Sequence, residues 1–105
     1  MAKAADVPTY VEQGAADIGI VGKDVLLEEQ KDLYEVLDLG FGKCRMAVAG
    51  FPEGKKLLNQ RGDFRVGSKY PEIARRYFLS PHQPPLLLPL NGSLELAPIV
   101  GLAHV

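Results

Sequence analysis

Cysteine is nearly absent from this sequence, and neither sign of charge is in excess. The single Cys44 excludes an internal disulfide and has no nearby Cys or His for a zinc site, which favours a reducing cytoplasm. The formal net charge is -1 with both signs mixed, so the chain lacks the charge pattern that nucleic acid or an anionic membrane attracts. No apolar run approaches a membrane span, and residues 1–5 lack the apolar core of a signal peptide. We therefore expect a cytoplasmic protein that binds neither nucleic acid nor membrane.

Well-known catalytic motifs are missing as well. We identify no Walker-type loop, no Rossmann glycine fingerprint, no Ser-His-Asp set and no pair of catalytic carboxylates. His82 lies in a proline-rich loop without a second ligand or triad partner, so we interpret it as a surface residue. The residues alone thus assign no catalytic group and no metal ligand.

Alternating strand and helix patterns fill the chain, and its 47% hydrophobic content suits one folded domain. The predicted strands are 17–22, 34–39, 45–50, 64–68 and 86–90, with 102–105 as the start of another. The predicted helices are 6–14, 23–28, a short one within 55–62, 72–79 and 94–100. Such alternation predicts an α/β fold with a mostly parallel sheet and flanking helices.

Two helices carry more specific expectations. In the helix opened by Pro71, apolar spacing predicts a core face, and Arg75 and Arg76 lie on the solvated face. The expected core residues are Ile73, Ala74, Tyr77 and Phe78. Ser93 is expected to cap the helix that follows the Asn91-Gly92 turn.

Polar junctions follow three predicted strands, at Gly22-Lys23, Ser68-Lys69-Tyr70 and Asn91-Gly92-Ser93. Ligands of parallel sheets bind at the carboxyl ends of strands, so these junctions are candidate binding sites. The segment 40–45, which has two glycines and follows Asp38, is a possible fourth wall. Each junction is equally compatible with a plain turn and solvated charges. The residues alone indicate an anion- or nucleotide-binding α/β domain.

Distinctive motifs occur in one order along nearly the whole chain: 6–12, 14–24, Leu-Asp-Leu-Gly-Phe-Gly-Lys-Cys-Arg at 37–45, 69–78, and Leu-Asn-Gly-Ser-Leu-Glu-Leu-Ala-Pro at 90–98 with Gly-Leu-Ala at 101–103. Together they resemble ATP phosphoribosyltransferase, the first enzyme of histidine biosynthesis. The resemblance implies a bilobal fold like the type II periplasmic binding proteins. On this basis, residues 1–40 belong to the first lobe, 41–90 to the second, and 91–105 return towards the first.

The resemblance also implies a reaction, in which ATP and phosphoribosyl pyrophosphate give N1-phosphoribosyl-ATP and pyrophosphate, with Mg²⁺ on the departing pyrophosphate. It places substrate contacts, but no assigned catalytic residue, at Asp38, Arg45, Ser68, Lys69, Tyr70, Asn91, Gly92, Ser93 and Glu95. The implied partners are further copies of the chain and a regulatory subunit similar to histidyl-tRNA synthetase.

Two family segments have no counterpart here: an N-terminal strand with a Lys-Gly-Arg-Leu motif, and a Glu-Thr-Gly-Arg-Thr type loop that grips the phosphoribosyl phosphate. His104 stands where the family has an acidic residue. We therefore expect the isolated chain to be inactive. The alternative is a non-enzymatic nucleotide- or anion-binding module of periplasmic-binding-protein type.

Overall fold

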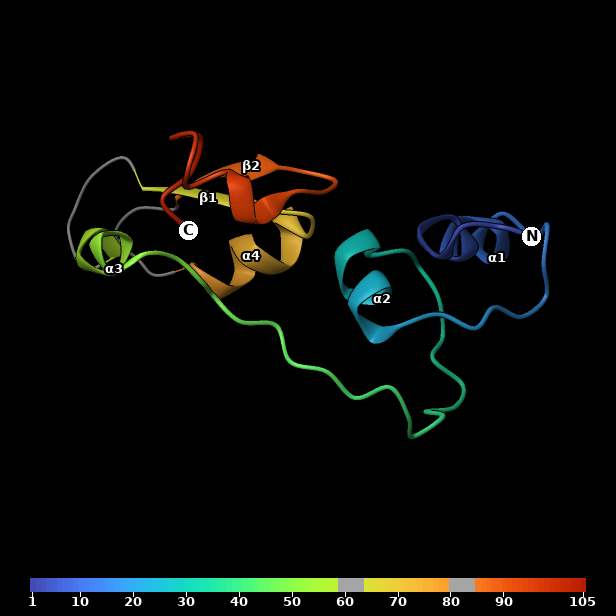
Figure 1. Ribbon diagram of the computed structural model, residues 1–105. Helices are drawn as coiled ribbons and strands as arrows, with labels where there is room; N and C mark the ends of the chain where they lie inside the picture. The colour runs from blue at the N-terminus through green and yellow to red at the C-terminus, as the bar shows by residue number, and fades with distance from the viewer. Residues whose placement is uncertain (59–63, 80–84) are drawn as a thin grey trace. The chain divides into compact units, whose positions relative to one another are not determined.

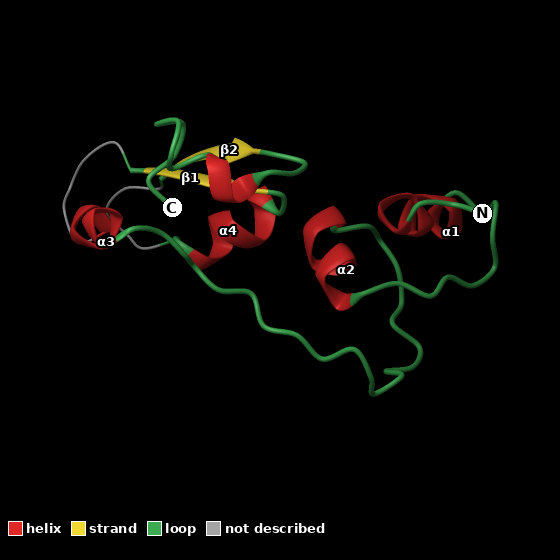
Figure 2. Ribbon diagram, viewed as in Figure 1, coloured by secondary structure: helices red, strands yellow, loops and turns green. Residues whose placement is uncertain are grey.

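The computed structural model describes residues 1–58, 64–79 and 85–105, which form two compact units, Met1–Arg45 and Met46–Val105 (Figure 1). Helices and a small parallel sheet make this an α/β protein, as the sequence predicts (Figure 2). The elements are η1 (Ala4–Asp6), α1 (Val7–Glu12), α2 (Lys23–Glu29), α3 (Pro52–Leu58), β1 (Arg65–Ser68), α4 (Pro71–Tyr77), β2 (Leu86–Pro89) and η2 (Leu94–Leu96).

Unit 1, Met1–Arg45, is built on the two helices α1 and α2. Asp6 occupies the N-cap position of α1, although its side chain makes no capping hydrogen bond, and Pro8 is accommodated in the first turn. Gly14 follows the helix with φ +76°, a conformation that favours glycine. Both helices therefore lie where the sequence predicts them, and local signals suffice to begin and end α1.

Two polar interactions tie the second half of unit 1 to its helices. The Asp32 backbone N–H donates to Glu12 Oε2 over 2.9 Å, and Lys23 at the start of α2 forms an ion pair with Glu35. Both interactions are exposed to solvent, so each contributes little stability. The segment after α1 also packs closely, since a Cβ added at Gly19 would lie 2.5 Å from Val7 Cγ1.

Three predicted strands, at 17–22, 34–39 and 45–50, are not strands in the structure. Residues 33–51 contain no helix, strand, turn or bend, and Figure 2 colours this segment as loop. A strand requires a neighbour to accept and donate its backbone hydrogen bonds. Among the described residues, none supplies that neighbour. The three strand predictions were therefore wrong for this chain, although the segments have an apolar, β-branched composition.

Unit 2, Met46–Val105, contains the sheet. β1 and β2 pair in parallel with Arg65 opposite Leu86 and Ser68 opposite Pro89, and α4 lies between them in sequence and packs on β2. The Phe64 ring meets Phe78 edge to face at 6.2 Å and stacks on His104 at 5.5 Å. Among the described residues of unit 2, the buried apolar side chains are Phe64, Val66, Ala74, Ala97 and Ala103.

The segment predicted to begin another strand, 102–105, lies beside β1. The His104 N–H donates to the Arg65 carbonyl over 2.8 Å, and the Gly67 N–H donates to the Val105 carbonyl over 2.9 Å. His104 Nδ1 also accepts the Arg65 N–H at 3.0 Å. β1 therefore has hydrogen-bonded neighbours on both edges, although 102–105 is not itself a regular strand.

Several local expectations for unit 2 were wrong. Ser93 has φ 54° and makes no capping hydrogen bond, and the predicted helix 94–100 reduces to η2 followed by turns, with Gly101 at φ +76°. Tyr77, the last residue of α4, is 76% exposed, so it is not part of the core. The helix expected within 55–62 begins earlier, at Pro52. His82 and the remainder of 59–63 and 80–84 lie outside the described residues.

Candidate functional site

The carboxyl ends of β1 and β2 lie at the same edge of the sheet. Parallel pairing places Ser68 opposite Pro89, and the Leu90 N–H donates to the Ser68 carbonyl over 2.9 Å. The chain leaves β1 through Lys69 and leaves β2 through Asn91, so the two polar junctions of unit 2 start from adjacent points. This is the edge at which parallel sheets bind ligands.

The first junction is shaped by its own serine. Ser68 Oγ accepts the Tyr70 N–H at 2.9 Å, which folds the backbone immediately before Pro71 opens α4. Ser68 and Tyr70 are half-buried, whereas Lys69 is exposed. Lys69 thus places an exposed cation on a junction whose backbone is held by a local hydrogen bond.

The second junction, 91–95, is exposed throughout. A Cβ added at Gly92 would meet nothing within 4 Å, so the turn has open space around it. Ser93 adopts the left-handed conformation, and Glu95 lies on the short η2. Behind this turn the packing is tight, because a Cβ at Gly67 would lie 3.2 Å from Leu90 Cδ1.

The remaining predicted site residues, Asp38 and Arg45, belong to unit 1. Asp38 Oδ1 accepts the Gly40 N–H at 2.8 Å, which gives this carboxylate a local structural role. Gly40 and Gly42 have φ of +74° and +68°, so the glycine-rich segment does use the backbone freedom that its composition predicts. Arg45 is exposed. The roles of all these residues in substrate binding stay predictions.

Glu72 and Arg75, on the helix that follows the first junction, form an ion pair with each other. Arg75 donates to Glu72 Oε2 at 2.7 Å on the exposed side of α4. The hydrogen bond and negative charge of Glu72 raise the pKa of Arg75. Arg75 therefore remains a cation paired on the surface of the helix, as the sequence predicts for a solvated face.

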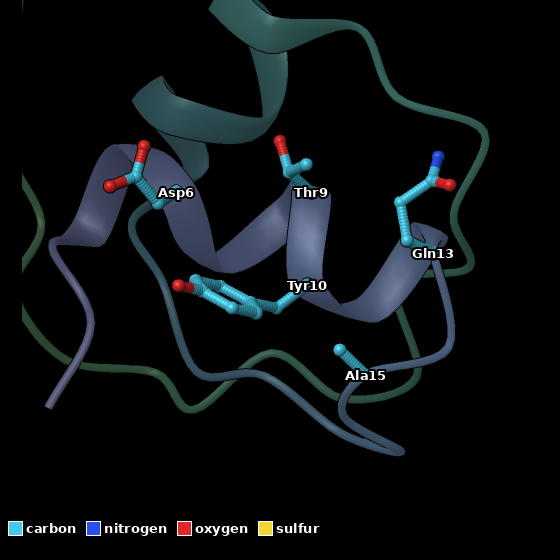
Figure 3. A pocket seen from close by; sticks show the side chains of 5 residues that line it. All are labelled: Asp6, Thr9, Tyr10, Gln13 and Ala15. Atoms are coloured by element: carbon cyan, nitrogen blue, oxygen red, sulfur yellow. The ribbon is translucent and has the colours of Figure 1, made fainter.

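Unit 1 also carries a hollow of about 400 Å³ that sequence reasoning missed. Figure 3 shows its lining side chains, which project from the end of η1, from α1 and from the turn after α1: Asp6, Thr9, Tyr10, Gln13 and Ala15. Their helical spacing was the available signal, since residues 6, 10 and 13 share one face. The lining provides a carboxylate and no cation, so it offers no charge complementary to a phosphate.

The described part of the chain contains neither a metal-binding cluster nor a membrane-spanning helix. Within 1–58, 64–79 and 85–105, no three His, Cys, Asp or Glu side chains gather in a group able to hold a metal ion. Over the same ranges, every helix is too short or too polar to cross a bilayer.

Comparisons with known proteins cover almost the whole chain. The family model HisG, described as ATP phosphoribosyltransferase, matches residues 3–105. ATP phosphoribosyltransferases of Lachnoclostridium phytofermentans and Ruminiclostridium cellulolyticum are each 59% identical to this chain. Each alignment is 106 positions long and covers 100% of this chain, but 49% and 50% of the two relatives, respectively. A solved structure titled ATP phosphoribosyl transferase (HisG:HisZ) complex from Thermotoga maritima matches 99% of this chain and 50% of that one, with 34% identity and a TM-score of 0.72. The chain spans about half the length of the relatives it matches.

Proposed function

The chain belongs to the ATP phosphoribosyltransferase family, and from this premise we propose that it forms part of the catalytic region of an enzyme that joins ATP to phosphoribosyl pyrophosphate. The products are N1-phosphoribosyl-ATP and pyrophosphate, in the first step of histidine biosynthesis. The observation that carries the proposal is the family match over residues 3–105. Because the chain spans half of its relatives, we expect no turnover from it alone.

The proposed reaction needs no nucleophile from the protein. Adenine N1 attacks the ribosyl carbon, an N–C bond forms, and the carbon–oxygen bond to pyrophosphate breaks. Positive charge develops on the sugar and negative charge on the leaving group, so orientation and electrostatic stabilisation provide the catalysis. The absence of a recognisable Ser-His-Asp motif from the sequence is compatible with this chemistry.

We assign roles to the polar junctions on the chemistry of their residues. Lys69 and Arg45 contact phosphate oxygens, and Tyr70 stacks on or makes an edge contact with adenine. The turn at 91–93 contributes donors, and Asp38 and Glu95 complete the set of substrate contacts. The adjacent ends of β1 and β2 support the parts of this assignment that fall in unit 2.

Several finer features belong to the same proposal. The complete catalytic region has a bilobal type II periplasmic-binding-protein fold, acts in the cytoplasm and assembles as a homo-oligomer with a regulatory subunit similar to histidyl-tRNA synthetase. The HisG:HisZ composition of the Thermotoga maritima relative supports a second kind of subunit. Mg²⁺ would enter with the pyrophosphate group as part of the substrate, and the described residues supply no metal-binding cluster of their own.

A chimaera tests the function directly. This chain replaces the 106 matched residues of the Lachnoclostridium phytofermentans enzyme, and formation of phosphoribosyl-ATP is measured. We expect turnover, and we expect Arg45→Ala and Lys69→Ala each to lower it about tenfold or more, since each removes a charge-assisted hydrogen bond. Arg75→Ala, which removes a cation paired with Glu72 outside the site, is the control expected to retain full activity.

Failure would take one of two forms. A folded chimaera that binds ATP without turnover would favour the non-enzymatic binding module. Equal activity of the Arg45, Lys69 and Arg75 variants would remove the residue assignment while leaving the family membership intact.

A further inference from the structure

His104 supplies a hydrogen-bond acceptor to β1 from its side chain. The Arg65 N–H donates to His104 Nδ1 at 3.0 Å, and the Arg65 carbonyl accepts the His104 N–H at 2.8 Å. One residue thus satisfies both backbone groups of Arg65. In a regular parallel pair, the acceptor for such an N–H is a backbone carbonyl of the neighbouring strand. Here an imidazole nitrogen takes the place of that carbonyl.

The path of the chain before His104 explains why a side chain takes this role. The Leu102 and Ala103 N–H groups both donate to the Ala97 carbonyl, at 2.9 and 3.3 Å, so the chain is turned towards Ala97 before it reaches β1. Segment 102–105 is accordingly not a regular strand. Few hydrogen bonds hold its end on β1, and the side-chain bond of His104 is one of them.

The bond from Arg65 requires an unprotonated Nδ1. Histidine is the side chain that changes charge between about pH 5 and pH 8, and both ring nitrogens of the cation are donors. Protonation of His104 would therefore set two N–H groups against each other where the Arg65 N–H now has its acceptor. Because this contact is partly buried, leaving the Arg65 donor without a partner is costly.

Two features could offset this cost. The imidazole stacks on the Phe64 ring at 5.5 Å, and an aromatic face attracts a cation. This attraction does not restore an acceptor to the Arg65 N–H. A carboxylate beside the ring would also stabilise the cation, but the ion pairs found among the described residues do not include His104.

The surrounding elements carry charges of both signs. Gly54 of α3 lies against the His104 carbonyl, and α4 approaches Phe64 through Phe78. The charged residues on these elements and on β1 and η2 are Arg65, Glu53, Lys55, Lys56, Glu72, Arg75, Arg76 and Glu95. Glu72 and Arg75 pair with each other. The hydrogen bond from Arg65 is therefore the polar contact of the His104 ring that protonation changes.

We propose that His104 is a pH-sensitive latch: its neutral imidazole holds segment 104–105 on the edge of β1, and its cation releases the segment. Release removes the bond from the Gly67 N–H to the Val105 carbonyl and opens one edge of β1. The pairing of β1 with β2 does not involve His104 and persists. This inference does not depend on the proposed function.

Release would also loosen the packing behind the first junction. A Cβ added at Gly67 would lie 3.5 Å from the Ala103 Cβ and 3.6 Å from the Ala97 Cβ, so the turn that leads to the latch packs directly against β1. Gly67 immediately precedes Ser68 at the end of the strand. The latch thus connects the charge of one imidazole to the support of the Ser68 junction.

Amide hydrogen exchange of this chain tests the latch. Protection factors, which are corrected for the intrinsic pH dependence of exchange, are compared at about pH 7.5 and about pH 5. We expect the Gly67 amide to lose protection at least about tenfold at the lower pH, while the Leu86 amide, bonded to Phe64 on the β2 side, loses less than about twofold. Equal losses at the two amides would indicate general acid unfolding and would overturn the proposal.

Two matched variants assign the response to one side chain. His104→Asn places Oδ1, an acceptor that does not titrate, at the same bond separation from Cβ as Nδ1. This variant should keep the Gly67 protection within about threefold at the higher pH and lose its pH dependence. The sequence has two histidines, and His82→Asn, the control, should leave the response unchanged. A response that survives His104→Asn, or that disappears with His82→Asn, contradicts the latch.

The imidazole itself provides a test that needs no substitution. Nitrogen chemical shifts should show His104 as the Nε2–H tautomer at the higher pH, and its titration should have the same midpoint as the loss of Gly67 protection. A proton on Nδ1 at the higher pH, or a titration without a change in exchange, would overturn the proposal. Both measurements are repeated in the chimaera, where the chain continues past Val105. A response confined to the separate chain would assign it to the chain end instead of the imidazole.

Discussion

Val36 in unit 1 and Val66 in unit 2 lie in segments with the same strand-like composition, yet Val36 is 92% exposed and Val66 is 5% exposed. β1, which contains Val66, is hydrogen-bonded to β2 on one side and to 104–105 on the other. The stretch around Val36 has no such neighbour among the described residues. An alternating, β-branched sequence therefore indicates that a segment can form a strand. Whether it does so depends on the presence of a hydrogen-bonding neighbour.

Truncating one phenylalanine in each unit should give the largest contrast. Phe64 is 9% exposed and contacts the Phe78 and His104 rings, whereas Phe41 is 77% exposed. We expect Phe64→Ala to lower the free energy of unfolding by about 3 kcal/mol or more through a core cavity, and Phe41→Ala to change it by less than about 0.5 kcal/mol. Urea titration followed by circular dichroism measures both. Similar losses of unfolding free energy in the two variants would contradict the difference in burial between Phe64 and Phe41.

Glycine-to-alanine substitutions at a crowded and at an open position of unit 2 should have smaller, and unequal, effects on stability. A Cβ added at Gly54 would lie 2.6 Å from the His104 carbonyl oxygen, a backbone atom that cannot move aside easily. Gly54→Ala should therefore cost about 1–3 kcal/mol. Gly92→Ala, which meets nothing within 4 Å, is the matched control and should leave stability nearly unchanged in the same titration. A destabilised Gly92 variant would contradict the open environment of that turn.

The smallest effect is expected from the ion pair of unit 1. Lys23 and Glu35 side chains are 62% and 42% exposed, so water screens their attraction. A double-mutant cycle with Lys23→Ala and Glu35→Ala should give a coupling free energy below about 1 kcal/mol that falls further in high salt. Coupling well above that value, or coupling insensitive to salt, would show that unit 1 is held together more firmly than its contacts indicate.

Local signals explain which parts of the fold were predictable from the sequence. Pro8 and Gly14 bound α1, and Pro71 opens α4, because each acts through its own backbone geometry. Ser93 misled for the opposite reason: its capping role depended on a backbone conformation that the surrounding turn does not allow, since its φ is 54°. The predicted strands of unit 1 failed because their hydrogen-bonding neighbours are not local.

The candidate site also has features that could be predicted from the sequence and features that could not. The sequence placed the Ser68 and Asn91 junctions at the carboxyl ends of strands in a parallel sheet, and the pairing of β1 with β2 makes these two junctions neighbours. The bond between Asp38 and the Gly40 N–H was not anticipated, because an acidic residue before a glycine-rich segment suggests a ligand as readily as a turn. The residue type predicts which interactions a side chain can make, such as hydrogen-bond acceptance by a carboxylate. Which group it actually binds depends on the local backbone conformation.

The two edges of β1 also imply an order of events in time. β2 joins β1 through the intervening α4, whereas the contact of Arg65 with His104 closes 39 residues of chain. Longer closure costs more entropy, so we expect the β1–α4–β2 part to form first and 104–105 to dock afterwards. In pulsed hydrogen exchange during refolding, the Leu86 amide, bonded to Phe64, should become protected before the Gly67 amide, bonded to Val105. β1 would then pair with β2 early and with 104–105 late. Until 104–105 dock, the second edge of β1 has unpaired backbone groups that another chain could bind.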